Sequence, residues 1–470
     1  MAHLTSVLLL GAASSCAAFV PQTAFSGSAL KAANRAASGA SLSMSALPKI
    51  VVTGVGSVSA VGWGADAHFQ KLLAGESGLK KMPSWADEYP AQVGALVDPS
   101  FDPAEWMDKR ESRRQGRYTH FAMAASKMAI EDAKLDVTAI DSDKFGVLIG
   151  SGIGGVEFFE DNCNKFTAAG GNGAGLKKVS PFLIPALISN TASGVVAIDL
   201  KARGPNFGVV SACATGTHAI GTAMDFMLRG EADVMLAGGS EAAMTPLCFA
   251  GFAAMKAMVT SFNDDPHKAS RPFDKDRAGF VMGEGAGVLL LETEAHALAR
   301  GATIYCEVVG YGATCDAHHI TAPAPDGSGL GRAIETALKR AGMKPEDMEG
   351  GYINAHGTST PYNDKFETMA IKRALGDSAY KAYISSTKSM MGHTLGAAGG
   401  LEAVVCAQVL KSGEIPPTLN LDNPDLEAGC DLNYCPHTKV VPTEKIRYAI
   451  SNNLGFGGHN ACVAFKAYDA

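Results

Sequence analysis

The chain has 470 residues, of which 47% are hydrophobic and 19% charged, and it contains 53 glycines. This composition excludes a fibrous or disordered protein and favours an α/β enzyme with two or three domains or one large two-lobed unit. The net charge of −7 gives the chain as a whole no attraction for nucleic acid or for an anionic membrane.

The first 47 residues differ in composition from the rest. A short apolar stretch is followed by small residues around Cys16 and then by a basic, Ala/Ser-rich segment, and the first acidic residue is Asp66. These features are typical of a targeting peptide. The AAFVP junction (17–21) resembles the bipartite presequences of algae with complex plastids. We therefore expect residues 1–47 to be a signal plus transit peptide, and the mature protein to reside in the plastid stroma. An ordinary secretory signal is the alternative, but it would place the cysteines in an oxidising compartment.

From Pro48 onward, apolar runs with strand and helix periodicity alternate. In the first part we expect strands within 49–56, 144–155 and 232–240, and helices within 181–200 and 294–301. The alternation then begins again, with strands within 304–312, 351–360 and 382–389, helices within 331–342, 365–376 and 395–413, and two strands flanking a Gly-rich loop within 448–468. The pattern predicts two successive α/β halves, 48–300 and 301–470, in one unit with largely parallel sheets covered by helices.

The sequence shows neither a membrane span after residue 47 nor a metal-binding motif. No apolar run after residue 47 approaches the ~18 residues that a span needs. The ten cysteines form neither a CxxC pair nor a Cys/His cluster with zinc spacing. We expect reduced thiols, no membrane span and no metal.

One cysteine lies where an apolar strand-like run meets a small-residue helix, in VVSACATGTHAIG (209–221). If the chain changes from strand to helix here, Cys213 lies at a helix N-terminus. Free N–H groups and the helix dipole at that position lower a thiol pKa and favour a nucleophilic thiolate. The alternative is a packed structural cysteine.

Two histidines follow strands in the second half. His356 lies in NAHGTST (354–360), and Lys388 and His393 lie in SSTKSMMGH (385–393). Each histidine stands beside glycine where a strand passes into a loop, the position at which α/β folds place their sites. Core histidines with satisfied hydrogen bonds are the alternative. A metal site is disfavoured, because the sequence contains no HExxH motif.

Taken together, Cys213 in SACATGTHAIG, His356 in NAHGTSTPYND, Lys388 and His393 in SSTKSMMGH, and Phe456 in NLGFGGHN resemble the β-ketoacyl-[acyl carrier protein] synthases, the elongating types I and II most closely. The resemblance extends from about residue 48 to 468. It implies the thiolase fold, in which two similar βα halves form a five-layer αβαβα core, and a homodimer.

The resemblance also implies a reaction. Cys213 would accept an acyl group from acyl carrier protein as a thioester. His356 and His393 would bind the malonyl thioester carbonyl and stabilise the enolate formed as CO₂ leaves, and the carbanion would attack the acyl group to give 3-oxoacyl carrier protein. No metal or redox cofactor is implied.

Supporting roles come from the same motifs. Lys388 would pair with Asp364 and Glu367 and so maintain the geometry of the site. The backbone N–H groups of Cys213 and Phe456 would form an oxyanion hole, and the Phe456 ring would gate the entry of the acyl chain. For the charged residues the alternative is a solvated surface position, and for Phe456 it is a core aromatic at a strand end.

Other positions match the parts of the family that bind substrate. Thr358 and Thr360 would hydrogen-bond the pantetheine arm, and Ile153 would line the acyl pocket. Thr358 and Thr360 could instead be turn-formers, and Ile153 could simply belong to the core. The cations expected to dock the acidic carrier protein are Lys177, Lys178, Lys256, Arg113 and Arg114. The alternative for the last two is a solvated helix face.

The sequence departs from the family pattern at three positions, Leu454, Met391 and His459, of which the first two could change acyl-chain preference or access to the pocket. Within the family, type II is favoured over type I by DNPDLEAGCDLNYCPH (422–437) and LKKVSPF. A coenzyme A-using thiolase or chalcone-type enzyme is disfavoured by the pair of histidines. A non-catalytic chain-length-factor partner would lack the nucleophile, and Cys213 is present.

Overall fold

The computed structural model describes residues 47–469, so the presequence expected at residues 1–47 lies outside the described residues apart from Leu47. The strands are β1 (Ile50–Ser59), β2 (Gly62–Trp63), β3 (Lys80–Lys81), β4 (Val93–Ala95), β5 (Phe145–Gly150), β6 (Val234–Glu241), β7 (Met282–Gly283), β8 (Gly285–Thr293), β9 (Cys306–Cys315), β10 (Tyr352–Asn354), β11 (Tyr383–Ser385), β12 (Tyr448–Gly455) and β13 (His459–Ala467). The helices are α2 (Asp66–Leu73), α3 (Lys109–Ser112), α4 (Arg117–Ala133), α5 (Val156–Ala168), α6 (Gly173–Leu176), α7 (Leu183–Leu187), α8 (Thr191–Leu200), α9 (Thr215–Leu228), α10 (Pro246–Ala254), α11 (Glu294–Ala299), α12 (Ser328–Ala341), α13 (Pro361–Leu375), α14 (Lys388–Met391) and α15 (Ala398–Ser412).

The main sheet is mixed, with the strand order β11-β10-β12-β13-β9-β1-β8-β6-β5. The expectation of largely parallel sheets is wrong. Only the pairs β5–β6, β10–β11 and β10–β12 of this sheet are parallel among the described residues. The loop 456–458 between β12 and β13 is too short for a crossover, so these strands pair antiparallel. Strand β8 lies between β1 and β6 and is antiparallel to both.

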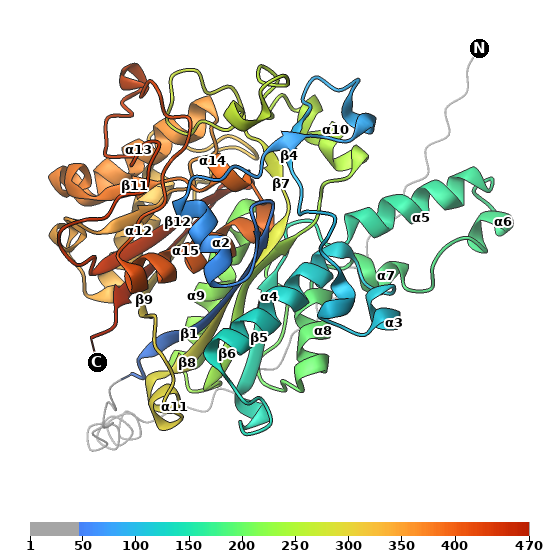
Figure 1. Ribbon diagram of the computed structural model, residues 1–470, viewed down its shortest axis with the longest axis horizontal. Coiled ribbons are helices and arrows are strands. Elements are labelled where there is room, and N and C mark those ends of the chain that lie inside the picture. The colour runs from blue at the N-terminus through green and yellow to red at the C-terminus, as the bar shows by residue number, and fades with distance from the viewer. Residues whose placement is uncertain (1–46, 470) are drawn as a thin grey trace, which may run out of the picture. The chain divides into compact units, whose positions relative to one another are not determined.

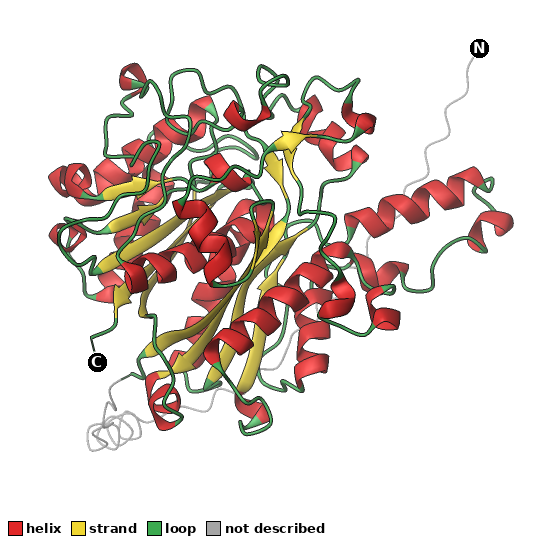
Figure 2. Cartoon of the chain, viewed as in Figure 1, coloured by secondary structure: helices red, strands yellow, loops and turns green. Residues whose placement is uncertain are grey.

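Helices cover the strands of both halves of this sheet, so that layers of helices and strands alternate (Figures 1 and 2). Helices α4 and α8 cover one face of the first-half strands β1, β5, β6 and β8, whereas α12 and α13 cover the second-half strands from the other side. Helices α9 and α15 lie between the halves and contact strands of both. This arrangement confirms the five-layer αβαβα architecture. The halves also meet at a sheet edge, where the first residues of β1 pair with those of β9.

Small residues allow the two central helices to approach closely. A Cβ atom added at Gly216 of α9 would lie 2.5 Å from the backbone nitrogen of Gly400 in α15. A Cβ atom at Gly399 would lie 2.5 Å from the backbone nitrogen of Thr217. The Ala/Gly-rich segments at the starts of these helices therefore serve close packing of backbone on backbone.

Most elements expected from the sequence are present, but one expected helix is divided. The segment 181–200 forms α7 and α8, which are separated at residues 188–190. Helices α5 and α6 project from the first half, as Figure 1 shows at the right. Between residues 47 and 469, no helix is both long and apolar enough to cross a membrane.

Candidate active site

Cys213 lies in a sharp turn immediately before α9. The turn is a short 3₁₀ segment, Ala212–Ala214, and Ala212 has a φ of 50°, in the left-handed region that alanine rarely adopts. Such a conformation costs about 1–2 kcal/mol and is found where the surrounding structure imposes it, often at functional sites. The strain places the thiol at the N-terminus of α9, as the sequence predicts.

The thiol and both histidines meet in one cavity of about 460 Å³. Cys213 enters it from the first half, and His356 and His393 enter it from the second half. The two imidazole rings are perpendicular, with centroids 5.2 Å apart. Residues that are separated widely in the sequence therefore surround a single space.

Burial sets the ionisation of these groups. It raises the pKa of the Cys213 thiol to about 12, although the charge of Lys388 acts in the opposite direction. The expected lowering of this pKa is therefore wrong for the substrate-free protein, because the thiol is almost fully removed from water. Burial and Lys388 hold the pKa values of His356 and His393 well below the usual value, so both rings are neutral at neutral pH.

His356 follows β10, and its surroundings fix its tautomer. The Asn453 side-chain nitrogen donates to His356 Nδ1 over 3.1 Å and to Glu402 Oε2 over 2.7 Å. Because Nδ1 accepts, the ring proton resides on Nε2. Neutral His356 can thus offer one N–H donor.

His393 is positioned by the first half of the chain. Its backbone nitrogen donates to the Val281 carbonyl over 2.7 Å, and its carbonyl accepts from Gly283 over 2.9 Å. Its Nδ1 is buried without a hydrogen-bond partner among the described residues. The ring also meets the Phe280 ring edge to face at 5.5 Å.

Lys388 has a different partner from the one expected. Its ammonium group forms a buried ion pair with Glu402 of α15, not with Asp364 or Glu367. The reason is geometric: Lys388 begins α14 and its side chain meets α15, whereas the carboxylates of α13 are occupied by backbone groups. Glu402 then connects Lys388 through Asn453 to His356.

Glu367 supports the loop that carries His356. Its two carboxylate oxygens accept from the backbone nitrogens of His356 and Gly357, each over 2.7 Å. Burial raises the pKa of Glu367 to about 8, although these two N–H groups lower it. Glu367 therefore supports the site, as expected, but through the backbone rather than through Lys388.

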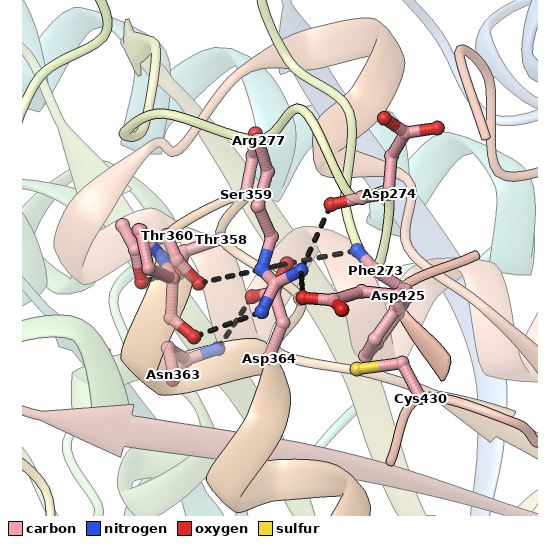
Figure 3. A network of polar contacts seen from close by, with 12 residues as sticks. Phe273, Asp274, Arg277, Thr358, Ser359, Thr360, Asn363, Asp364, Asp425 and Cys430 are labelled. Atoms are coloured by element: carbon pink, nitrogen blue, oxygen red, sulfur yellow. Dashed lines mark hydrogen bonds and ion pairs between the residues drawn. The ribbon is translucent and has the colours of Figure 1, made fainter. Parts of the chain in front are cut away.

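Asp364 belongs to a second network, centred on Arg277 (Figure 3). Its carboxylate accepts from the Phe273 nitrogen over 2.9 Å and lies 3.7 Å from the Arg277 guanidinium. Arg277 is almost fully buried, pairs with Asp425, and donates to the carbonyls of Thr360 and Pro361 at 3.1 and 2.9 Å. This network fixes the backbone at one wall of the cavity.

Thr358 and Thr360 lie on that wall. Both line the cavity, and their hydroxyl oxygens are 3.0 Å apart. Ile153 is not among the described residues that line the cavity, but it packs in the same apolar cluster as Cys213. Its backbone nitrogen donates to the buried Glu241 carboxylate, which also accepts from Gly152 and Gly396.

Phe456 lines the cavity from the loop between β12 and β13. Gly455, just before it, packs against the turn that carries Cys213: a Cβ atom there would lie 2.5 Å from the Ser211 carbonyl oxygen and 3.3 Å from the Cys213 nitrogen. Only glycine allows this approach. The loop that carries Phe456 and the turn that carries Cys213 are therefore neighbours.

The five cations expected to dock a carrier are all exposed, but they occupy different elements. Lys256 follows α10 and lines the cavity. Lys177 and Lys178 follow α6, whereas Arg113 and Arg114 follow α3. The Arg114 guanidinium lies over the Phe182 ring at 5.0 Å. Of the five, only Lys256 is placed at the cavity among the described residues.

The three departures from the family pattern have different surroundings. Leu454 lines the cavity, whereas Met391 is buried in the main apolar core. His459 opens β13 directly beside the 456–458 loop. Within residues 47–469, no three His, Cys, Asp or Glu side chains gather as a metal site would need.

Several residues of the site are missed by reasoning from the sequence. Glu402, Asn453, Glu241 and Arg277 are all buried or nearly so and all hydrogen-bond to site residues or their backbone. A signal is present for two of them: Glu402 is a lone acid in the apolar run GLEAVVC, and Glu241 is a lone acid that ends an apolar strand. Charged residues are rarely buried without partners, so both positions could have been recognised as candidates.

Known proteins match this chain over most of its length. Residues 48–297 match the N-terminal domain of β-ketoacyl synthases, and residues 305–422 match the C-terminal domain. A 3-oxoacyl-[acyl-carrier-protein] synthase 2 from Synechocystis is 50% identical over 422 residues, covering 89% of this chain and 98% of the relative. One from Staphylococcus aureus is 46% identical over 432 residues, covering 91% and 100%.

Solved structures agree with these matches. A type II PKS ketosynthase, solved in complex with its acyl-carrier protein and a hexaketide, superposes with a TM-score of 0.82 at 32% identity, covering 90% of this chain and all of that one. A β-ketoacyl synthase from Burkholderia phymatum has a TM-score of 0.79 at 33% identity with the same coverage. With the site geometry, these matches show that the chain belongs to the β-ketoacyl synthase family.

Proposed function

We propose that this protein elongates fatty acyl chains as a 3-oxoacyl-[acyl carrier protein] synthase, with Cys213 as nucleophile and His356 and His393 as the groups that stabilise the enolate. The observation that carries the proposal is the single cavity lined by all three side chains. The names of the Synechocystis and Staphylococcus relatives, both synthase 2, support the type II assignment over type I.

In the first step Cys213 Sγ attacks the thioester carbonyl of an acyl carrier protein. A new thioester forms on Cys213, the bond to the pantetheine sulfur breaks, and the Cys213 proton leaves with the carrier thiol. The protonated state of the free thiol is consistent with this order, because the proton departs only when an acyl donor is present.

In the second step malonyl carrier protein loses CO₂, and the electron pair of the broken bond passes into the thioester as an enolate. Neutral imidazoles can donate N–H to the developing oxyanion, and the tautomer of His356 provides that donor at Nε2. The carbanion carbon then attacks the acyl carbon on Cys213, the bond between that carbon and Cys213 Sγ breaks, and the sulfur takes up a proton from water. Loss of CO₂ supplies the carbanion, so the reaction needs neither a metal nor a redox cofactor.

Lys388, Glu402 and Asn453 act on this chemistry through His356. Thr358 and Thr360 hydrogen-bond the pantetheine arm and Phe456 gates the acyl chain in this proposal, and their positions on the cavity wall support these roles. Backbone N–H groups of Cys213 and Phe456 would receive the acyl oxyanion, which the closeness of Gly455 to Cys213 supports.

The partner is an acidic acyl carrier protein, and Lys256 at the cavity is the first cation it would meet. Lys177, Lys178, Arg113 and Arg114 extend this docking surface. Exposed charge pairs act mainly on the encounter rate. Lys256→Glu should therefore raise KM for carrier-bound substrates about tenfold at low salt, with kcat nearly unchanged, whereas Lys339→Glu on α12 should have no such effect. Equal effects of the two variants would contradict this docking site.

The working unit is a homodimer. Large apolar side chains lie exposed on and around α8, among them Ile188, Ile198, Phe207 and Val210, and Ile198 is 70% exposed. Apolar patches of this kind mark interaction surfaces. Sedimentation equilibrium should give a dimer for the protein and a monomer for Val210→Asp; a monomer for both would contradict the proposal.

The protein resides in the plastid stroma, to which a presequence at residues 1–47 directs it. Support comes from the acid-free composition of this segment. Fused to a fluorescent protein and expressed in an alga with complex plastids, this segment should direct fluorescence to the plastid, and the mature protein should begin near residue 45. Secretion of the fusion would contradict the assignment.

The direct test of the function is condensation by the mature protein. Acyl carrier proteins loaded with chains of different lengths are mixed with malonyl carrier protein, and products are weighed by mass spectrometry. The wild type should give 3-oxoacyl carrier protein, and Cys213→Ala should give none. Condensation by Cys213→Ala would overturn the proposal.

A further inference from the structure

A third histidine, His218, lies one turn of α9 after Cys213. Its Nδ1 is 2.5 Å from the hydroxyl oxygen of Ser211, which is the residue before the strained Ala212. Burial lowers the pKa of His218 to about 4, although the backbone of Asn460 in β13 acts in the opposite direction. The ring is therefore neutral at neutral pH, and its Nδ1 shares a hydrogen bond with the Ser211 hydroxyl.

The ring of His218 lies against His459, which opens β13 directly beside the loop that carries Phe456. Residues 456–458 close the hairpin between β12 and β13, in which Gly455 pairs with His459. The His459 ring lies against Gly457, where an added Cβ atom would be 2.9 Å from His459 Nε2. The rings of His459 and His218 are perpendicular, with centroids 6.4 Å apart.

The loop has a second support on its other side. The Gly457 nitrogen donates to the Ile320 carbonyl over 2.6 Å, and the Cys315 thiol lies 3.8 Å from the Gly457 carbonyl. The loop is therefore held between the 315–320 segment and His459. On the side of His459, the His218 ring lies between the hairpin, which it meets through the His459 ring, and the turn that carries Cys213, to which it hydrogen-bonds through Ser211.

We infer that Ser211, His218 and His459 form a bridge that couples the position of the Phe456 loop to the turn that carries Cys213. When the loop moves, His459 moves with it, and His218 transmits the movement to Ser211. The bridge therefore resists opening of the loop and keeps the thiol shielded until an acyl chain enters. These are positioning residues, and the functional meaning of the bridge rests on the proposed function.

A purely structural role would give a different result. If the Ser211–His218 pair only stabilised the fold, its removal would expose Cys213 equally to large and small reagents. A bridge predicts selective exposure, because only a long reagent needs the loop to open.

The test compares alkylation of Cys213 by iodoacetamide and by N-octyl iodoacetamide, followed by intact mass. The ratio of the long-chain rate to the short-chain rate reports opening of the loop. His218→Asn, which keeps an acceptor for Ser211 but is too short to reach the His459 ring, should raise this ratio about fivefold. Ser211→Ala should raise it as well, and it serves as the second variant should His218→Asn unfold. His218→Gln, whose longer side chain can still reach the His459 ring, should return the ratio towards the wild type.

The matched control is His437→Asn, at an exposed histidine whose φ of 65° suits asparagine. Its ratio should equal that of the wild type. Phe456→Ala alone should raise the ratio. Adding Phe456→Ala to His218→Asn should raise the ratio of the double variant less than twofold further, because both changes open the same loop. An unchanged ratio in His218→Asn and Ser211→Ala, or an equal rise for both reagents, would overturn the bridge. No carrier protein is used, so failure of the proposed condensing activity would leave this result standing.

Discussion

The two halves of the molecule share one scaffold and differ in the loops. The first half runs β1, α4, β5, α8, α9, β6, β8, and the second runs β9, α12, β10, α13, β11, α15, β12, β13. The strand orders β1-β8-β6-β5 and β9-β13-β12-β10-β11 then correspond, and the segment at Asn206, which bridges to Val147 of β5, takes the place of β11. Different residues with reactive side chains follow these two segments. The first half has Cys213 after the segment at Asn206, and the second half has Lys388 and His393 after β11.

Both halves use a buried glutamate side chain to hold the loop after the corresponding strand. Glu241 accepts from the backbone of Gly152 and Ile153 after β5, and Glu367 accepts from His356 and Gly357 after β10. The second half adds a buried ion pair at its central helix, between Glu402 of α15 and Lys388 of α14. The comparison teaches that the duplicated scaffold supplies rigidity, whereas each half contributes its own chemistry.

The strongest test of this comparison removes the buried ion pair between Lys388 and Glu402 in the second half. Lys388→Met leaves Glu402 buried without its cation, which costs about 3–5 kcal/mol of unfolding free energy. Urea unfolding measures this loss. The double variant Lys388→Met/Glu402→Leu should recover much of it, because no uncompensated charge remains. A loss below about 1 kcal/mol in the single variant would contradict the burial of this pair.

A second test uses the pH dependence of Glu367. The folded protein keeps a proton on Glu367 up to about pH 8, whereas the unfolded chain loses it near pH 4.5. The folded state therefore binds more protons between these values, and its stability falls as the pH rises from 5 to 8, by roughly 3 kcal/mol from this group. In Glu367→Gln this part of the slope should be missing from urea unfolding measured at pH 5, 6.5 and 8. An unaltered slope would show that Glu367 is ionised throughout.

The contact between the central helices gives a third, smaller effect. Gly216→Ala would push α9 away from the backbone of α15 and should cost about 1–3 kcal/mol in thermal or urea unfolding. Gly251→Ala in α10 is the matched control, because a Cβ atom there meets nothing within 4 Å. The control should be neutral or more stable by up to about 1 kcal/mol. Similar losses for both variants would argue against close packing of the two halves.

The last prediction concerns the reactivity of the Cys213 thiol and involves no change in stability. With its pKa raised to about 12, free Cys213 should react with iodoacetamide at a rate that rises about tenfold per pH unit from pH 6 to 10. Intact mass after timed quenching measures the rate, and Cys213→Ala identifies background alkylation. An alkylation rate that levels off near neutral pH would show that the thiol is already ionised there, as the sequence predicts.

The sequence predicts most of the elements and the three side chains of the cavity, because strand ends, glycine turns and motif residues are local features. The five layers follow only from the resemblance to the synthases. It does not predict the partners of those side chains. The motif assigns Lys388 to Asp364 and Glu367, but its partner Glu402 comes from another helix. The predicted sheet direction is wrong because strand–helix alternation does not reveal that β8 inserts between β1 and β6. The pKa of Cys213 depends on burial, which a helix N-terminus does not indicate.

The central claim is that the thiol of one half, which holds the acyl group, and the imidazoles of the other, which stabilise the malonyl enolate, act together in one condensation. The most direct measurement is the intact mass of the acylated protein after malonyl carrier protein is added. In the wild type the acyl mass on Cys213 should disappear as 3-oxoacyl carrier protein forms. In His393→Ala the acyl group should still load onto Cys213 and then remain there. Loss of the acyl mass from His393→Ala at the wild-type rate, or an acyl group on any other residue, would contradict the account.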